Sequence, residues 1–240
     1  MPLPVIQQPI FEVYLKSLDR KVKFRPFLVK EEKILLMTKE SNDDETVLRA
    51  VKQMISNCCL EDINLDALPT FDVEMFFVHL RMRSISETVM LNYTCEKKNE
   101  SGEICGFVNE YQLDLDKIKY DILEEHTRDI KLSDKVGVKM NYPVLSNAGL
   151  FLTEDAFDNA LNLIQANIQY VYDENQVYDR SVFNDEELRQ FLETLSTDQI
   201  SLISEFFTTA PRAVLDDKSV CKKCGCEHRI FAEDLYSFFI

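Results

Sequence analysis

Four cysteines lie in two pairs whose spacing suits a metal site. Cys95 and Cys105 are separated by nine residues, and Cys221 and Cys224 form a C-x-x-C in the segment VCKKCGCEH. Zinc prefers four ligands in a tetrahedron, and two cysteine pairs on tight turns supply them. We therefore predict one structural zinc held by Cys95, Cys105, Cys221 and Cys224. A site closed by four protein ligands has no open position for a substrate, so its role would be structural.

Glycines beside the cysteines support this prediction. The chain has only five glycines, and Gly106 and Gly225 directly follow the last cysteine of each pair. A residue without a Cβ lets the backbone turn with positive φ at these positions. An alternating apolar run then follows each turn, at 111–115 and at 230–232. A cysteine turn that leads into a strand, found twice, is typical of a zinc ribbon.

Other side chains compete for the same metal positions. Cys226 and His228 lie within reach of the second pair, so six candidates exist for four places. His228 also suits a surface position on a strand. A C-x-x-C can be a redox pair, but no strand-to-helix context surrounds Cys221. Cys58 and Cys59 are expected to be small buried apolar residues.

Periodic apolar residues predict the elements that position the first cysteine pair. Alternation predicts strands at 11–15, 22–24, 89–93, 107–115 and 136–142. A period of 3.6 residues predicts helices at 30–37, at 43–57 and from Thr70 onward. Cys95 follows one predicted strand and Cys105 precedes the next. The first cysteine loop should therefore join two antiparallel strands.

The C-terminal third is predicted to be helical as far as the second cysteine pair. Thr153 can cap a helix, Asn184 with Glu187 forms a capping box, and Ser196 with Gln199 forms another. The expected fold class is therefore α+β. It consists of a mostly helical body with short antiparallel strands and a zinc-ribbon-like module built from two distant cysteine pairs.

Four segments are expected to form one compact unit. Residues 1–85 hold a strand pair and helices, 86–143 hold strands and the first cysteine pair, and 144–211 are helical. Residues 212–240 hold the second pair and should pack back on 86–116. The apolar end of the chain, Phe238 to Ile240, should be buried there, because free termini are usually polar.

The charge balance disfavours nucleic acid as a partner. Lys and Arg total 27 and Asp and Glu total 42, which gives a net charge of −15. Binding to phosphates needs clustered cations. Five cations do gather around the cysteines, Lys97, Lys98, Lys222, Lys223 and Arg229, but solvated charge on short turns is the simpler interpretation. No apolar run reaches 18 residues, so no membrane span is expected.

Catalytic motifs are not found in the sequence. It contains no glycine-rich phosphate loop, no H-E-x-x-H and no G-x-S-x-G. Of its three histidines, His79 is expected to be partly buried on a helix, His126 to face solvent in a charged stretch, and His228 to lie on a strand. We therefore expect a protein without catalytic activity, although an enzyme of unrecognised chemistry stays an alternative.

Both ends of the chain resemble a family of bacteriophage proteins. The opening PLPVIQQPIFEVYLKS, followed by KFRPFLVKEEKILLM, is similar to the baseplate hub subunits and hub assembly proteins of contractile-tailed phages, the myophages. The closing EELRQFLETLSTDQISLISEFFTTAP, followed by CKKCG and YSFFI, is similar to the same family. The resemblance covers residues 2–240. The family's first cysteine pair is a tighter C-x-x-C-G, so the spacing of Cys95 and Cys105 departs from it.

The resemblance implies a function in building the phage baseplate hub. The expected partners are other baseplate hub or tail proteins. The expected location is the host cytoplasm during assembly, and the virion tail baseplate if the protein stays in the particle. An odd number of cysteines and no secretory signal at the N-terminus agree with a reducing compartment. The alternative function is a zinc-ribbon nucleic-acid-binding protein related to transcription.

Overall fold

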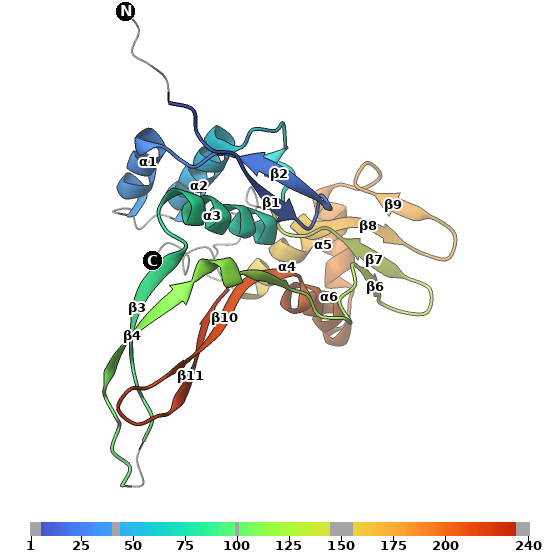
Figure 1. Cartoon of the computed structure of the whole chain (residues 1–240). Coiled ribbons are helices and arrows are strands. Elements are labelled where there is room, and N and C mark those ends of the chain that lie inside the picture. Colours follow the sequence, from blue (N-terminus) through green and yellow to red (C-terminus); the bar gives the residue numbers. More distant parts are fainter. Residues whose placement is uncertain (1–5, 40–43, 99–100, 145–155, 234–240) are drawn as a thin grey trace, which may run out of the picture. The chain divides into compact units, whose positions relative to one another are not determined.

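The computed structural model describes residues 6–39, 44–98, 101–144 and 156–233. Side chains are described in these ranges except at 35–39, 44–45 and 156–157. The chain divides into two compact units. Unit 1 comprises residues 1–65, 71–121 and 212–240, and unit 2 comprises 66–70 and 122–211. Figure 1 labels their helices and strands.

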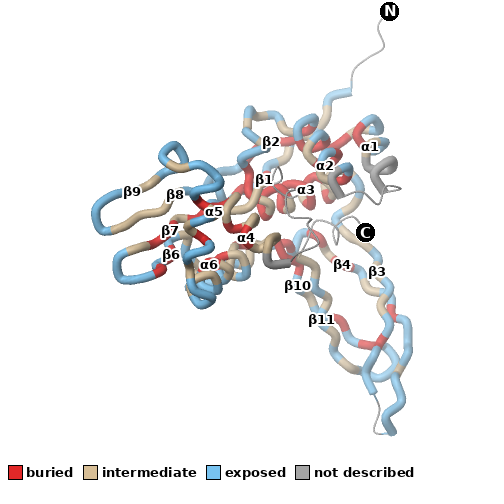
Figure 2. The backbone as a smooth tube through the Cα atoms, turned by 180° about the vertical axis from the view of Figure 1, so that it is seen from behind, coloured by how far each residue is buried: buried red, intermediate tan, exposed pale blue. Residues whose placement is uncertain are grey.

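The N-terminal part of unit 1 packs a hairpin on a buried helix. Strands β1 (Phe11–Leu15) and β2 (Arg20–Phe24) pair antiparallel with Val13 opposite Val22, as the alternation predicts. Helix α3 (Thr70–Ser84) is buried along much of its length (Figure 2). The ring of Phe24 lies 5.4 Å from that of Phe76 on α3. Helices α1 (Val29–Lys39) and α2 (Asp44–Cys58) complete this part, close to the predicted ranges.

A buried carboxylate ties the β1–β2 turn to the rest of unit 1. Asp72 on α3 has no exposed surface and accepts hydrogen bonds from the backbone N–H groups of Lys16 and Ser17, both at 2.9 Å. It also accepts one from the hydroxyl of Tyr120 at 2.5 Å. A buried charge is tolerated only when its hydrogen bonds are satisfied, and three donors satisfy this one.

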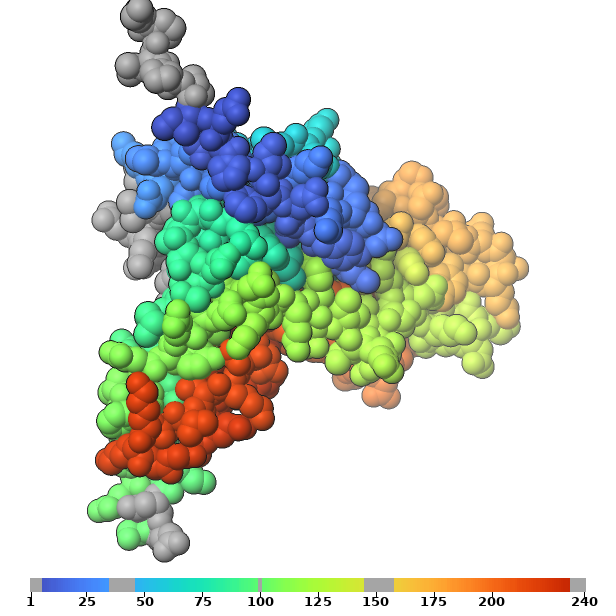
Figure 3. All heavy atoms as spheres, viewed as in Figure 1, coloured from blue at the N-terminus to red at the C-terminus, as the bar shows by residue number. Residues whose placement is uncertain are grey.

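Two hairpins from distant parts of the sequence carry the cysteines. Strands β3 (Thr88–Thr94) and β4 (Val108–Asp114) form one hairpin, as predicted. Strands β10 (Arg212–Val220) and β11 (Glu227–Ala232) form the other. Strand β10 also pairs with β5 (Lys119–Asp121), which follows a short 3-10 turn at Leu115–Lys117. Figures 1 and 3 show the two hairpins in contact.

Unit 2 is a four-stranded antiparallel sheet with three helices. The sheet order is β6 (Asp129–Lys131), β7 (Gly137–Met140), β8 (Ile168–Tyr172) and β9 (Val177–Asp179). The helices are α4 (Ala156–Asn167), α5 (Asp185–Glu193) and α6 (Thr197–Thr209). One apolar core joins sheet and helices, and it includes Val138, Met140, Leu161, Ile164, Leu192 and Ile203.

Local helix signals in unit 2 are confirmed. Asn184 and Glu187 form a reciprocal capping box at the start of α5, and Ser196 and Gln199 form one at the start of α6. Each box satisfies backbone N–H groups that the first helical turn leaves without partners. The expected cap at Thr153 and the expected burial of Phe238 to Ile240 lie outside the described residues.

The expectation of a mostly helical body is wrong. The described residues contain six α-helices but also eleven strands in several antiparallel sheets. The longest strand that the sequence did not predict is β10. Its Asp216, Asp217 and Lys218 are poor strand formers, so they hide the alternation of apolar residues that marks a strand. Pairing of these three residues with β11, and of Arg212 to Val214 with β5, overrides that local preference. The description of the cysteines as two distant pairs is also wrong for the folded protein, because all four cysteines form one cluster.

Candidate metal centre

Four sulfur atoms gather where the two cysteine hairpins meet. Sγ of Cys95 lies 3.6 Å from Sγ of Cys224, and Sγ of Cys105 lies 3.9 Å from Sγ of Cys221. All four sulfurs lie within 4.8 Å of one another. A tetrahedral zinc with Zn–S bonds of about 2.3 Å has sulfur–sulfur edges of about 3.8 Å. The cluster therefore has the dimensions of a site that could hold a metal ion.

The cysteines are free thiols and not disulfides. The structure contains no S–S bond among the described cysteines. A disulfide needs its sulfurs at about 2.05 Å, far closer than the two nearest sulfur pairs here. Each close pair joins one cysteine of the first hairpin to one of the second. Two cross-linking disulfides would thus need the sulfurs to approach by more than an ångström.

Backbone hydrogen bonds hold both cysteine pairs. At the first pair the N–H of Gly106 donates to the carbonyl of Cys95 at 3.0 Å across the hairpin, and in the tight turn of the second pair the N–H of Gly225 donates to that of Cys221 at 2.9 Å. Gly106 and Gly225 have positive φ values of 62° and 69°. Other residues adopt this conformation only with strain, so the glycines permit both turns. This confirms the backbone conformation that the sequence predicted.

Polar residues of the facing strands fix the orientation of the cysteines. Asn109 on β4 is 1% exposed, and its Nδ2 donates to Sγ of Cys221 at 3.5 Å. Its Oδ1 accepts the backbone N–H of Lys222 at 2.9 Å. The hydroxyls of Tyr93 and Ser219 lie 2.9 Å apart and join the two hairpins. Asn109 was not among the residues predicted from the sequence, although its alternation with Tyr111 and Leu113 on one face of a strand was a usable signal.

The two further candidate ligands occupy different positions. Cys226 donates its thiol hydrogen to the carbonyl of Glu227 at 3.4 Å, and its sulfur is not part of the four-sulfur cluster. Nε2 of His228 lies 3.1 Å from Sγ of Cys95, and its ring packs 5.2 Å from that of Tyr93. The imidazole is therefore placed to donate a hydrogen bond to a sulfur, as residues around a metal site do.

Neighbouring groups shift the pKa values of two cysteines in opposite directions. Burial, together with the neighbouring thiols, raises the pKa of Cys95 to about 12. Burial also opposes ionisation of Cys221, but backbone N–H groups of Lys223 and Cys224 and the amide of Asn109 outweigh it and lower its pKa to about 6. A bound cation would favour the thiolate form at every sulfur, because metal ligands must lose their protons.

Lysines surround the cluster. Lys97, Lys98, Lys222 and Lys223 are exposed next to the cysteines in the sequence. Nζ of Lys223 donates to the carbonyl of Cys105 at 3.0 Å. Zinc with four thiolates carries a net charge of −2, and nearby cations offset part of it. If the cluster holds zinc, the lysines would have a structural explanation that requires no nucleic acid.

The remaining histidines have structural environments. Nδ1 of His126 lies 3.0 Å from Oγ1 of Thr209, and its Nε2 lies 3.1 Å from the hydroxyl of Tyr142. Its ring also packs against those of Tyr142 and Phe206. His79 lies on buried helix α3, and burial lowers its pKa.

Comparison with known proteins assigns the chain to a family. Residues 8–240 match the family model of the T4 bacteriophage base plate protein. The chain belongs to this family. No curated protein and no solved structure matches the chain.

Family membership makes this chain a phage baseplate structural protein. It supports a location in the tail baseplate of the virion and interaction with other phage tail proteins, and it suggests a function without catalysis. Among the helices in the described part of the chain, none is long and apolar enough to cross a membrane. The resemblance noted at both ends of the sequence to myophage baseplate proteins is confirmed at the level of the family.

Proposed function

We propose that this protein is a non-enzymatic structural or assembly component of the baseplate hub. It acts through protein–protein contacts, and a structural zinc stabilises it. The observation that carries the proposal is the family match over residues 8–240. The hub assignment is finer than the family description and is supported by the similarity of both chain ends to hub proteins.

The hub assignment is tested by removing the gene from the phage. Tail intermediates from infected cells are then purified and examined by electron microscopy. We expect outer baseplate parts without a completed central hub, and hubs restored when the gene is supplied on a plasmid. Completed hubs in its absence would contradict the assignment.

Zinc is proposed because the donor set and its geometry suit it. Four sulfurs at tetrahedral spacing favour zinc or an iron–sulfur centre, since both bind thiolates. The cluster spacing agrees with one ion at its centre, and the donor N–H groups of Asn109 and His228 stabilise thiolates. The ligands come from hairpins more than a hundred residues apart in the sequence. One ion would thus hold together two parts of unit 1 that share no sheet.

Assembly through protein contacts also accounts for the expected location. We propose that the chain is present in the host cytoplasm while the baseplate forms. Quantitative mass spectrometry of purified virions and of infected-cell extracts tests whether it then stays in the particle. A defined copy number per virion would show a permanent component, and absence from the virion would show a transient assembly factor.

A further inference from the structure

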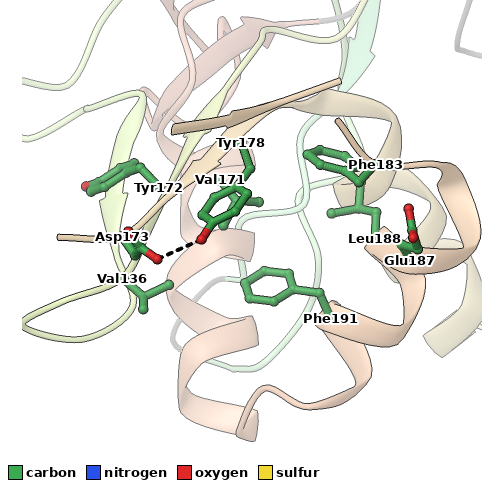
Figure 4. Close-up of a pocket in the computed structure, with 9 residues that line it drawn as sticks. All are labelled: Val136, Val171, Tyr172, Asp173, Tyr178, Phe183, Glu187, Leu188 and Phe191. Atoms are coloured by element: carbon green, nitrogen blue, oxygen red, sulfur yellow. Dashed lines mark hydrogen bonds between the residues drawn. The ribbon is translucent and has the colours of Figure 1, made fainter. Parts of the chain in front are cut away.

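Unit 2 contains an open apolar cavity that the proposed hub function does not yet explain. Its volume is about 290 Å³, and it lies between the sheet and helix α5 (Figure 4). Val136, Val171, Phe183, Leu188 and Phe191 form most of its wall. The rings of Phe183 and Phe191 are only partly buried. Exposed apolar hollows of this kind mark sites of interaction more often than ordinary surface.

Two carboxylates border this cavity. Asp173 accepts the N–H groups of Asn175 at 2.7 Å and Gln176 at 2.9 Å and the hydroxyl of Tyr178 at 2.8 Å. These hydrogen bonds lower the pKa of Asp173 and keep it ionised. Glu187 accepts the backbone N–H of Asn184 at 2.9 Å as part of the capping box. Both carboxylates are therefore held in place by the fold.

No cation within the described residues neutralises these two carboxylates. Lys135 pairs with Glu174 at 3.1 Å, and Arg180 pairs with Asp185 and lies over the ring of Phe183. Unit 2 has seventeen acidic and six basic side chains, so it carries −11 of the net charge of −15. The cavity is thus an apolar hollow with unpaired negative charge at its border.

These dimensions and charges restrict what the cavity can bind. Its volume is at the lower end of small-molecule sites, which range from about 300 to 1,000 Å³. It suits one large side chain better than a cofactor. Its border has carboxylates and phenol groups but no cluster of cations for a phosphate. A second copy of this chain is disfavoured, because both copies carry −15 and repel each other.

We propose that this cavity binds a segment of another phage tail protein. The segment presents one large apolar or aromatic side chain to Phe183 and Phe191, and lysine or arginine next to it pairs with Asp173 and Glu187. Apolar burial supplies most of the affinity, and the carboxylates select the sign of the partner's charge. This inference rests on the proposed assembly function and adds the chemistry of the partner.

Labelled synthetic peptides test the chemistry of the site. The probe is a short peptide with one phenylalanine between lysines, and its matched forms have glutamates in place of the lysines or serine in place of the phenylalanine. Fluorescence anisotropy measures their binding to the full-length protein. We expect the lysine–phenylalanine peptide to bind most tightly, with affinity only partly reduced by salt, because the apolar contact is not screened.

Variants of the cavity test where the peptide binds. Phe183→Ala should weaken binding about tenfold by removing apolar contact. Glu187→Gln removes a charge but keeps the capping box, since glutamine also suits this position, and should weaken binding about two- to fivefold. Asp198→Asn is the matched control, because Asp198 is an exposed carboxylate of unit 2 that is not part of the cavity. Thermal melting checks that each variant is folded.

Three results of the peptide experiments would overturn the proposal. One is equal binding of the acidic and basic peptides, and another is no binding of any peptide at millimolar concentration. The third is wild-type affinity in folded Phe183→Ala protein. Self-association that these variants abolish would assign the cavity to a second copy instead.

The variants are then supplied to a phage that lacks the gene. We expect Phe183→Ala to reduce hub completion, and unchanged assembly would contradict a tail partner at this cavity. Hubs that form without the gene at all would instead refute the proposed function, whatever the peptides show.

Discussion

At the scale of single residues, the four cysteines depend on neighbours that hold them in place. Asn109 and His228 reach sulfur atoms from facing strands, and the turn glycines adopt positive φ. Further along the same two hairpins, the carboxylate of Asp217 accepts a hydrogen bond from the hydroxyl of Tyr111 at 2.5 Å and one from Nζ of Lys117 at 2.6 Å. The cysteine cluster and the Asp217 carboxylate thus lie at separate points along the length of the two hairpins.

Replacing one cysteine of the cluster should remove the metal. We expect about one zinc per chain in wild-type protein by elemental analysis, and little or none in Cys221→Ser. Structural zinc contributes on the order of 10 kcal/mol of apparent folding free energy, so the variant and chelator-treated protein should both melt at much lower temperature. Cys226→Ser is the matched control and should keep its zinc, because its sulfur lies outside the cluster. Wild-type protein with iron or without metal would contradict this prediction.

Removing the charge of Asp217 should weaken the contact between the hairpins. Hydrogen bonds from Lys117 and Tyr111 lower the pKa of this carboxyl group to about 2, so it is ionised at neutral pH. Asp217→Asn should lower the free energy of unfolding by about 1–2 kcal/mol, because Lys117 is half-exposed and solvent screens its part. Urea denaturation measures the change. Asp216→Asn, which removes an exposed pair with Arg229, should cost less than about 1 kcal/mol.

At the scale of elements, unit 2 depends on close packing of strands β6, β7 and β8. Gly137 on β7 pairs with Lys131 on β6 and with Tyr172 on β8. The ring of Tyr172 crosses the space above Gly137, and its hydroxyl donates to Asp129 at 2.6 Å. The absence of a Cβ at this position is what lets the ring lie there.

Gly137→Ala should therefore destabilise unit 2. A Cβ at this position would collide with the ring of Tyr172 and lie 2.9 Å from the carbonyl oxygen of Ile130. We expect a loss of about 1–3 kcal/mol in the free energy of unfolding, typical of overpacking. In a Tyr172→Ala background the same change should cost less, because the ring is gone. Equal costs in both backgrounds would show that the ring is not the cause.

His126 should make the stability of unit 2 depend on pH. Burial, followed by the charge of Arg128, lowers the pKa of His126 below its ordinary value of 6.5. The unfolded chain then binds a proton more readily, so stability falls as the pH drops from above 6.5 through the lower folded pKa. His126→Gln should show a shallower loss between about pH 7 and pH 5, measured by denaturant unfolding. The pKa of His79 in unit 1 is lowered as well, so unfolding of unit 1 should depend on pH in the same direction in the variant and in the wild type.

At the scale of the whole molecule, the chain is strongly negative, but lysines gather next to the cysteines. The net charge is −15, and the lysines near the cysteine cluster lie on the segments that carry the four cysteines. This distribution suits contacts with basic surfaces of other tail proteins better than contacts with phosphates.

Tight binding of nucleic acid is therefore not expected. An anisotropy titration with labelled duplex and single-stranded DNA at physiological salt should give no dissociation constant in the micromolar range or below. The same assay at low salt checks for a weak electrostatic contribution from the lysines. Micromolar binding that weakens steeply with salt would contradict the prediction and favour a transcription-related function.

Features that depend on neighbours in sequence could be predicted from the sequence. The capping boxes at Asn184 and Ser196, the β1–β2 hairpin and the glycine turns need only interactions over a few residues. The four cysteines could be chosen for the same reason, since each pair is recognisable by its own turn. These local signals are strong because a side chain and the backbone groups it satisfies lie within one turn of each other.

Tertiary structure alone decided how these parts combine. Strand β10 forms despite its run of three charged residues, Asp216 to Lys218, because it pairs with its hairpin partner β11 and with β5 from a distant part of the chain. Asn109 meets Cys221 only because two hairpins pack together, and the cavity of unit 2 exists only because α5 faces the sheet. Such contacts depend on which surfaces are buried against each other. Local sequence does not determine that choice, because the energy of long-range pairing outweighs local propensity.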